Sequence, residues 1–315
     1  MYKNLIKIST LGMSREDWLA ERKKSLGGSD VAALLGLNEY CSPYSLYAEK
    51  LGLLPEKEET EAMRIGKDLE EYVAKRFAEK TGKKVRKENA IIRNPDMPYL
   101  HANVDRVVVG ENAVLECKTV SALSLQQYKN GEYPARFYAQ CCAYMLVCGF
   151  DKAYLAVLVL GREFLIFEIE RDESELTALD NACRSFWNDN VLKKDAPGFD
   201  GSDATKEALK TIFAESAPGH TADLTAVSTH LSTYLQLKKR MKELEEELNL
   251  QQAYITEFMA DAEKGSFGNI SVSFKTQSRS TFDRELYELE NGAIADKYFK
   301  VSTQRPFKVT EKKGK

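Results

Sequence analysis

Apolar residues recur at two different spacings in the first two thirds of the chain, and these spacings predict alternating helices and strands. Apolar residues that recur every three or four positions predict helices at residues 14–25, 30–36, 43–51, 60–81, 134–148 and 172–194. Runs rich in Val, Ile, Leu and Tyr predict strands at Val85–Arg93, Tyr99–Val109, Ala113–Val120, Ala153–Leu160 and Phe164–Glu170. This order of elements predicts an α/β fold with a mixed central sheet flanked by helices.

The pattern changes near residue 198, because residues 196–203 are rich in Gly, Asp and Pro and suit a linker. A long charged stretch then carries one apolar stripe at 3-4 spacing: Tyr234, Leu237, Met241, Leu244, Leu248, Ile255 and Phe258, interrupted only by Gln251. Packing against a neighbouring helix accounts for this stripe, and a functional coiled coil is the alternative. Further strands are predicted at Ile270–Phe274 and Tyr298–Val309, before a basic tail.

We therefore predict three parts, a main domain at 1–198, a helical extension at 199–265 and a small β-containing region at 266–315. The 315 residues, 43% of them hydrophobic, suffice for one sizeable core plus an appended region. No apolar run approaches the roughly 20 residues that span a bilayer, and Met1–Gly12 lacks the features of a secretory signal. We expect a cytoplasmic protein that does not contact membranes.

Charge and cysteine content exclude two simple kinds of site. The formal net charge is −3, so any DNA contact must rest on local basic clusters or on metal bridging. One such cluster, Lys83, Lys84, Arg86, Lys87 and Arg93, suits backbone contacts, although a solvated charged loop is an equal alternative. The six cysteines include no C-x-x-C pair, which indicates reduced thiols and no cysteine-bound metal.

Two carboxylates and a lysine lie close together in the segment from His101 to Thr119. Glu116 and Lys118 share a strand face because side chains alternate, and Cys117 points the other way. With a tight turn centred on Glu111-Asn112, Asp105 lies opposite Lys118 on that same face. A surface Asp-Lys bridge is the alternative, but the flanking Val-Val-Val and Ala-Val-Leu favour a buried cluster.

A buried cluster of this kind requires a counterion, and a divalent cation supplies one. Oxygen ligands from Asp105, Glu116 and the backbone carbonyl of Cys117 suit Mg²⁺, with Mn²⁺ as the alternative. A metal there would polarise a phosphate and lower the pKa of a bound water, while Lys118 would orient or help deprotonate that water. The pattern therefore predicts phosphodiester hydrolysis.

Three further features suggest supporting groups. Glu70 follows Met63 by two helical turns, and Gly66 between them can allow close helix packing. Ser29 after Gly27-Gly28 suits an N-cap, which would leave an anion site at the helix start. Gln140 and Tyr144 share one helical face. Taken singly, a solvated glutamate and a structural cap are the preferred explanations of the first two features, and a buried Gln-Tyr hydrogen bond explains the third equally well.

These motifs occur in the order found in the YqaJ-type viral recombinase family, relatives of phage lambda exonuclease with a PD-(D/E)xK active site, and the sequence resembles that family over most of residues 14–195. The matching motifs are Trp18 to Gly36 with Arg22 and Ser29, Gly66-x-x-x-Glu70, Asn103-Val-Asp105-Arg, Glu116-Cys-Lys118, and Pro134 followed by Gln140 and Tyr144.

The resemblance implies a restriction-endonuclease-like core and a Mg²⁺-dependent exonuclease that degrades the 5′ strand from double-stranded DNA ends. The 3′ single strands would pass to a phage single-strand annealing protein. Arg22 and Ser29 would bind the 5′-terminal phosphate, Glu70 would be a metal-site or metal-proximal carboxylate, and Gln140 would lie near the bound phosphate or water. Tyr144 and Asn103 would support these groups.

The resemblance also implies a homotrimeric ring, by analogy with lambda exonuclease, and a phage or prophage origin in a bacterial host. Asn103 departs from the pattern, since lambda exonuclease carries a serine there, and the region after about residue 200 has no counterpart in that enzyme. An endonuclease on the same core and a non-catalytic DNA-end-binding protein remain alternatives. An iron–sulfur nuclease would require a cysteine set after the catalytic helix, and no cysteine follows Cys183.

Overall fold

A computed structural model describes residues 4–56, 58–294, 296–299, 305, 307 and 309. The chain forms two compact units, Met1–Phe213 and Ala214–Lys315. The predicted boundaries near residues 198 and 265 stay predictions. No helix in the described ranges combines the length and apolarity that crossing a bilayer requires.

The helices of the first unit follow the predicted apolar spacing closely, except for two helical segments, at residues 122–131 and 203–212, that lie outside the predicted ranges. They are α1 (Arg15–Lys23), α2 (Gly28–Leu34), α3 (Pro43–Lys50), α4 (Glu61–Thr81), α5 (Ala135–Cys148), α6 (Glu173–Ser185) with the π-helical turn η2 (Phe186–Leu192), and α7 (Asp203–Ile212), with the 3-10 segment η1 (Ala122–Gly131) before α5. The Thr60 side chain caps the start of α4, and Gly82 ends the helix at φ 71°, where a left-handed residue is needed. Local capping therefore sets the limits of α4.

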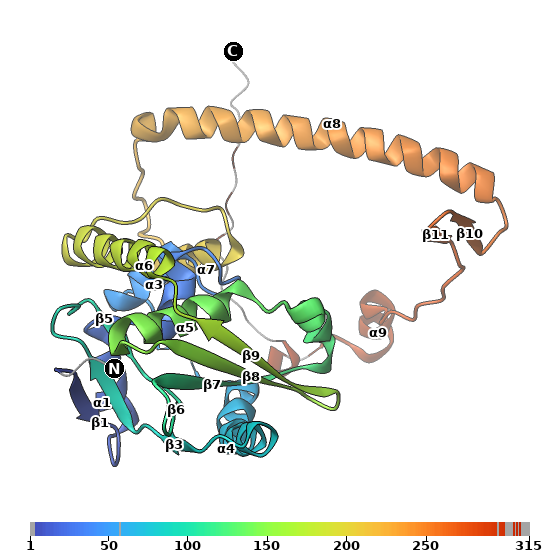
Figure 1. Ribbon diagram of the computed structural model, residues 1–315. Helices are drawn as coiled ribbons and strands as arrows, with labels where there is room; N and C mark the ends of the chain where they lie inside the picture. Colours follow the sequence, from blue (N-terminus) through green and yellow to red (C-terminus); the bar gives the residue numbers. More distant parts are fainter. Residues whose placement is uncertain are drawn as a thin grey trace. The chain divides into compact units, whose positions relative to one another are not determined.

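A five-stranded mixed sheet in the order β3-β6-β7-β8-β9 forms the centre of this unit. Its strands are β3 (Val85–Lys87), β6 (Arg106–Val108), β7 (Ala113–Val120), β8 (Lys152–Val159) and β9 (Glu163–Glu170). Only the pair β7 and β8 within it is parallel. In Figure 1 α4 lies below this sheet and α5 above it. The predicted fold class, a mixed sheet flanked by helices, is confirmed.

A second sheet has the order β1-β4-β5-β2. Its strands are β1 (Ile6–Ser9), β4 (Ala90–Arg93), β5 (Leu100–Ala102) and β2 (Leu26–Gly27). The predictions of single strands at Val85–Arg93 and Tyr99–Val109 were wrong, since each run is broken and supplies one strand to each sheet. Apolar alternation does not reveal such a change of partner, because both halves of each run remain buried on one side.

The two faces of the central sheet bury different residues, and this determines where polar groups of β7 project. Val73 and Phe77 of α4 pack with Leu115 on one face, and Cys117 packs against the same cluster. Val114 belongs to the cluster that contains α5. Because side chains alternate, Glu116 and Lys118 lie on the α5 face.

The second unit contains one long helix and short elements. They are η3 (Thr225–Val227), α8 (Ser228–Met259), the hairpin β10 (Lys264–Phe267) and β11 (Ile270–Ser273), α9 (Arg284–Asn291) and η4 (Asp296–Tyr298). The predicted strand at Ile270–Phe274 is confirmed by β11. Of the predicted strand Tyr298–Val309, Tyr298 ends η4, and most of its other residues, like the basic tail, lie outside the described residues.

Candidate active site

Asp105 and Glu116 come together where β6 and β7 begin to separate. The observed register pairs Val107 with Val114 and Arg106 with Leu115, which continues to Asp105 opposite Glu116. The predicted pairing of Asp105 with Lys118 was therefore wrong by two residues. The turn centres on Gly110 and Glu111, because Gly110 adopts φ 87°, which favours glycine. A shift of two positions preserves the shared face.

Glu116 and Lys118 are held by the amide of Gln140, which α5 presents to the sheet. Gln140 Nε2 donates to Glu116 Oε1 over 2.8 Å and to the Tyr144 hydroxyl over 2.7 Å. Lys118 Nζ donates to Gln140 Oε1 over 3.0 Å and lies 2.5 Å from Glu116 Oε1. The predicted Gln-Tyr pair is thus a real hydrogen bond, and it also orients the carboxylate and the lysine.

The charges in this cluster strongly perturb one another. Burial, with the nearby carboxylates of Glu116 and Glu70, raises the pKa of Asp105 well above its ordinary value. Burial lowers the pKa of Lys118, but Glu116 and Asp105 more than offset this, and the pKa lies above its ordinary value. Lys118 is therefore a cation, suited to stabilise negative charge and to orient a water.

Glu70 is close to this cluster but has another partner. It lies on α4, on the sheet face opposite Glu116, and its carboxylate binds the buried Arg106. Lys87 Nζ lies 3.8 Å from the same carboxylate. Within the described ranges no group of three or more His, Cys, Asp or Glu side chains is arranged to hold a metal. The structure therefore does not place Glu70 in one ligand set with Asp105 and Glu116.

The remaining donors nevertheless fit a hard divalent cation. Glu116 Oε2 is buried and has no hydrogen-bond partner among the described residues, so one carboxylate oxygen is available as a ligand. Asp105 Oδ2 accepts a hydrogen bond from Cys117 N over 2.8 Å, which brings its carboxylate to the backbone of the next strand. Asp105, Glu116 and the Cys117 carbonyl thus supply the oxygen donors that Mg²⁺ prefers. Asn103 Oδ1 is also buried, with no hydrogen-bond partner in the described part of the chain.

Arg22 and Ser29, the predicted phosphate-binding pair, are in direct contact. Arg22 Nη2 donates to Ser29 Oγ over 3.1 Å, and the guanidinium lies 4.6 Å from the Trp18 ring centroid. The prediction that Ser29 caps the helix was wrong, because α2 starts at Gly28 and its N-cap is Gly27. The Asp30 carboxylate accepts from Gly27 N over 2.8 Å and fills the capping role.

Sequence reasoning missed two residues that support this pair, Asp30 and Lys50. The buried Lys50 Nζ lies 2.6 Å from Asp30 Oδ2 and donates to the carbonyl oxygens of Arg22 and Ser25 over 3.1 and 3.0 Å. Burial raises the pKa of Asp30, but Lys50 and Arg22 more than offset this, and the pKa falls below its ordinary value. Asp30 neutralises one of the two cations, so one surplus positive charge remains beside Ser29. The capping-box spacing of Asp30 was the available signal.

His101 adjoins the same group of residues as a neutral side chain. Burial, with the positive charge of Arg22, lowers the pKa of His101 to about 3. Its Nδ1 lies 2.8 Å from Ser25 Oγ, and its Nε2 is buried without a partner among the described residues. The imidazole therefore adds no charge near Arg22.

This shift predicts a loss of stability in acid. The folded-state pKa of His101 lies below the ordinary 6.5, so the unfolded chain binds a proton that the folded chain does not. The free energy of unfolding has its full His101 contribution above pH 6.5. This contribution is lost as the pH drops from there toward about 3. Urea unfolding at pH 7 and pH 5 should show a fall that is about 2 kcal/mol smaller in His101→Asn, whose amide can keep the bond to Ser25. Equal falls would contradict this account.

The start of α2 packs directly on Tyr144, which joins the Arg22–Ser29 pair to the Gln140 network. A Cβ at residue 28 would lie 2.5 Å from Tyr144 Cε1, in a buried ring that cannot move aside cheaply. Residues 136, 140 and 144 share one face of α5, about 6 Å apart. The Arg22–Ser29 pair and the carboxylates therefore lie one helical turn apart along α5.

Gly28→Ala is expected to destabilise the protein by about 1–3 kcal/mol, because the buried Tyr144 ring must shift to admit the methyl group. Gly66→Ala is the matched control. The prediction of close helix packing at Gly66 was wrong, because nothing lies within 4 Å of an added Cβ there. That change should stabilise α4 by about 0.5–1 kcal/mol. Urea denaturation measures both, and equal effects at the two glycines would contradict the packing argument.

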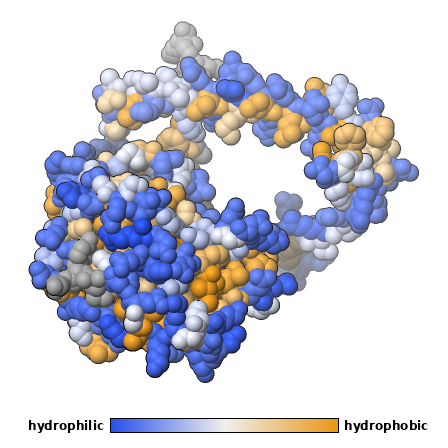
Figure 2. All heavy atoms as spheres, viewed as in Figure 1, coloured by the Kyte–Doolittle hydropathy of each residue, from blue (hydrophilic) through white to orange (hydrophobic). Residues whose placement is uncertain are grey.

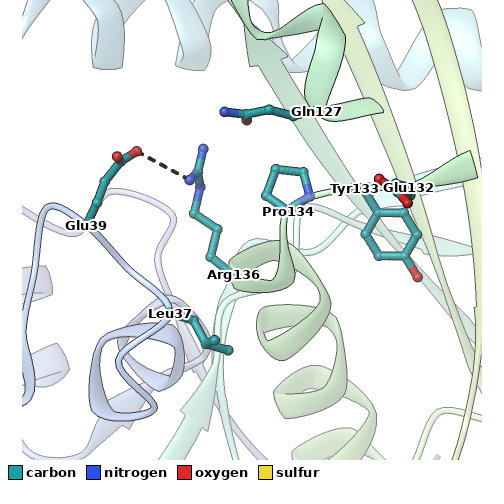
Figure 3. A pocket seen from close by; sticks show the side chains of 7 residues that line it. All are labelled: Leu37, Glu39, Gln127, Glu132, Tyr133, Pro134 and Arg136. Atoms are coloured by element: carbon teal, nitrogen blue, oxygen red, sulfur yellow. Dashed lines mark ion pairs between the residues drawn. The ribbon is translucent and has the colours of Figure 1, made fainter. Parts of the chain in front are cut away.

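A pocket of about 320 Å³ opens at the other end of α2 and at the start of α5. Figure 3 shows Glu39 and Arg136 facing one another across it, with Arg136 Nη1 3.6 Å from Glu39 Oε1. The Arg136 guanidinium and Lys118 Nζ both lie close to the Phe137 ring, at 4.9 and 5.0 Å from its centroid. Phe137 therefore contacts both Arg136, which lines the pocket, and Lys118 of the candidate active site.

The candidate basic cluster before β6 is largely ion-paired. Its partners are Glu111 for Lys83, Glu88 for Arg86, Glu70 for Lys87 and Glu21 for Arg93. Exposed pairs of this kind leave little net charge for a phosphate backbone. The structure thus favours the solvated, ion-paired interpretation of this loop.

Comparison with known proteins agrees with the resemblance in the motifs. Residues 17–151 match the family model of the YqaJ-like viral recombinase domain. The uncharacterized protein YqaJ of Bacillus subtilis (strain 168) is 39% identical over 303 residues, which cover 95% of each chain. The chain belongs to the YqaJ-like viral recombinase family. The predicted family is confirmed.

Solved structures give more distant similarities. The alkaline exonuclease LHK-Exo of Laribacter hongkongensis has 19% identity and a TM-score of 0.48, covering 56% of this chain and 93% of the other. Its complex with dAMP has 21% identity and a TM-score of 0.49 over the same shares. A phage-related exonuclease of Haemophilus somnus 129PT has 12% identity and a TM-score of 0.40, covering 54% and 96%. More than two fifths of this chain has no counterpart in these three structures.

Proposed function

We propose that this recombinase-family protein is a Mg²⁺-dependent exonuclease that digests the 5′ strand of double-stranded DNA from its ends. One observation carries the proposal: Asp105, Glu116, Lys118 and Gln140 converge in a buried cluster, and Glu116 Oε2 has no hydrogen-bond partner among the residues that the structure describes. A structural ion pair would satisfy both oxygens of a buried carboxylate. An unsatisfied oxygen beside a second carboxylate supports a cation site.

Different residues along α5 would bind the DNA end and act on the scissile phosphate. Arg22 and Ser29 would hold the 5′-terminal phosphate, with Lys50 and Asp30 fixing the position of Arg22. Lys118, kept cationic by Glu116, would orient the attacking water and offset the charge that develops on the scissile phosphate. Gln140 would hold Glu116 and Lys118 in place.

Asp105, Glu116 and the Cys117 carbonyl would hold Mg²⁺, or Mn²⁺ in its place, and Glu70 could join only after releasing Arg106. When bound, the cation supplies Lewis acidity toward the phosphate and a bound water of lowered pKa.

Metal binding can be tested without measuring activity. Mg²⁺ at 10 to 100 times its Kd should stabilise the wild-type protein by about 1.4–2.7 kcal/mol, whereas Glu116→Gln should lose this gain. The substitution keeps the side-chain shape but removes the ion-pair partner of Lys118, so the metal response is compared within each variant, in Mg²⁺ against EDTA. Thermal unfolding in Mg²⁺ and in EDTA measures both effects. Glu79→Gln, at an exposed position, should keep the metal response, and an unchanged response in Glu116→Gln would contradict the assignment.

The reaction is tested with linear duplex DNA carrying a 5′-phosphate or a 5′-hydroxyl, with Mg²⁺ or EDTA, beside a covalently closed circle. The expected result is loss of the 5′ strand from linear DNA only, faster with the 5′-phosphate and absent in EDTA. Cleavage of the circle would instead indicate an endonuclease, and binding without cleavage would indicate a DNA-end-binding protein. Either result would overturn the proposal.

The product suggests the partner. Digestion of the 5′ strand leaves a 3′ single strand, the substrate of a single-strand annealing protein, and we propose such a protein from the same phage as the partner. Co-expression and co-purification of the two proteins tests this proposal. The expected result is a complex that does not form when the proteins are expressed separately and mixed at high salt.

A further inference from the structure

The long helix α8 presents an apolar face along its whole length. Residues Tyr234, Leu237, Met241, Leu244, Leu248, Ile255 and Phe258 are each between 40% and 92% exposed. Figure 2 shows orange spheres along one side of this helix, with blue spheres on the other side. So much exposed apolar surface on one helix face is typical of an interaction site.

The spacing of this face is that of a coiled coil. The steps from Tyr234 to Phe258 are 3, 4, 3, 4, 3, 4 and 3 once Gln251 is included, a repeat of 3.5 residues over roughly 37 Å. A helix that packs on a globular surface needs a wider stripe of period 3.6. A strict 3.5 repeat keeps the seam straight only against another helix that supercoils with it.

Lysines and glutamates on the outer face of α8 pair with one another. Lys239 lies 3.8 Å from Glu243, and Lys242 lies 3.7 Å from Glu246, all on the side away from the apolar stripe. Arg240 and Glu245 flank the stripe instead, and neither forms an ion pair within the part of the chain that the structure describes. Lys238 and Glu247 flank the stripe as well, and these four charges are the candidates for contacts to a partner helix.

We infer that α8 forms a parallel, two-stranded coiled coil with α8 of a second copy of this chain. With Tyr234 at position a, Arg240 occupies g and Glu245 the following e. In a parallel, in-register pair, g of one helix faces the next e of the other, so Arg240 pairs with Glu245 twice. Charge complementarity therefore selects an identical partner.

The opposite orientation places like charges together. An antiparallel pair with full overlap of the stripe brings Glu245 against Glu245 and Glu247 against Glu247, which is unfavourable. The polar d residue Gln251 meets its own copy only in the parallel register, where the two amides can bond to each other. A shifted register would bury this amide against apolar side chains.

The association is tested on the full-length protein by light scattering after size-exclusion chromatography. Wild type should elute with twice the chain mass, and Leu244→Glu/Leu248→Glu should elute as a monomer. Asn249→Glu adds a charge on the outer face of the same turn and should stay dimeric. An unchanged thermal transition of the unit Met1–Phe213 shows that the double variant is folded.

A monomeric wild type, a trimeric mass as in the ring that the resemblance implies, or a dimer that the double variant leaves intact would overturn the inference. Dissociation by Asn249→Glu would overturn it too, since the effect would not be specific to the stripe.

Orientation is tested by cysteine substitution. In the parallel register Leu248→Cys faces its own copy, so mild oxidation should give a cross-linked dimer that wild type does not give, because its thiols are buried or half-buried. In the antiparallel register residue 248 faces residue 244. Cross-linking only in a mixture of Leu244→Cys and Leu248→Cys would therefore overturn the parallel arrangement.

Discussion

A Lys118→Ala variant is expected to hydrolyse linear duplex DNA about 10²–10³-fold more slowly than wild type. Lys118 is the cation nearest the unsatisfied carboxylate, 2.5 Å from Glu116 and bonded to Gln140. Its loss removes the charge that would offset the transition state, while Gln140 still holds Glu116 by its own amide. We therefore expect the rate to fall without loss of the fold, measured by single-turnover digestion at saturating Mg²⁺.

Lys152→Ala is the matched control for this prediction. Lys152 lies at the start of the neighbouring strand β8 and pairs with Glu168 and Glu170 at the surface. Its removal deletes the same charge from the same sheet and should leave the rate within about twofold of wild type. A Lys118→Ala variant that kept more than half of the wild-type rate would show that the lysine is structural.

The sequence could predict which side chains share a face but not which residues face one another. Alternation along β7 places Glu116 and Lys118 together in any register, and a two-residue shift leaves Asp105 on their face. The register itself depends on Gly110, whose left-handed backbone moves the turn back by one position. Turn conformation depends on long-range packing as well as on the two central residues, so the predicted turn at Glu111-Asn112 was wrong.

Contacts between elements distant in sequence could not be predicted, for a different reason. Arg106 of the sheet binds the carboxylate of Glu70 on α4, and Lys50 of α3 binds the carboxylate of Asp30 on α2. Neither contact has a periodic signal, because each joins single residues that the tertiary fold brings together. The motif order still located Arg22 and Ser29, whose hydrogen bond spans seven positions.

The second large effect concerns the chemistry of the DNA end. Wild type is expected to digest a 5′-phosphorylated end about 10–100-fold faster than a 5′-hydroxyl end, since charge-assisted hydrogen bonds contribute about 1.5–3 kcal/mol. Arg22→Ala should remove most of this preference while leaving the slower rate on the 5′-hydroxyl end unchanged. Single-turnover rates on the two substrates measure the ratio directly.

Graded substitutions separate binding by Arg22 from a purely structural role. Arg22→Lys keeps the charge but loses the planar fork, so it should retain only part of the preference. Lys23→Ala, next on the same helix and paired with exposed Glu56, should keep the full ratio. If Arg22→Ala slowed both substrates equally, its contact with Trp18 would matter for the fold and not for the phosphate. A selective loss on the phosphorylated end requires the phosphate to lie against Arg22, one helical turn along α5 from Gln140 and the carboxylate it holds.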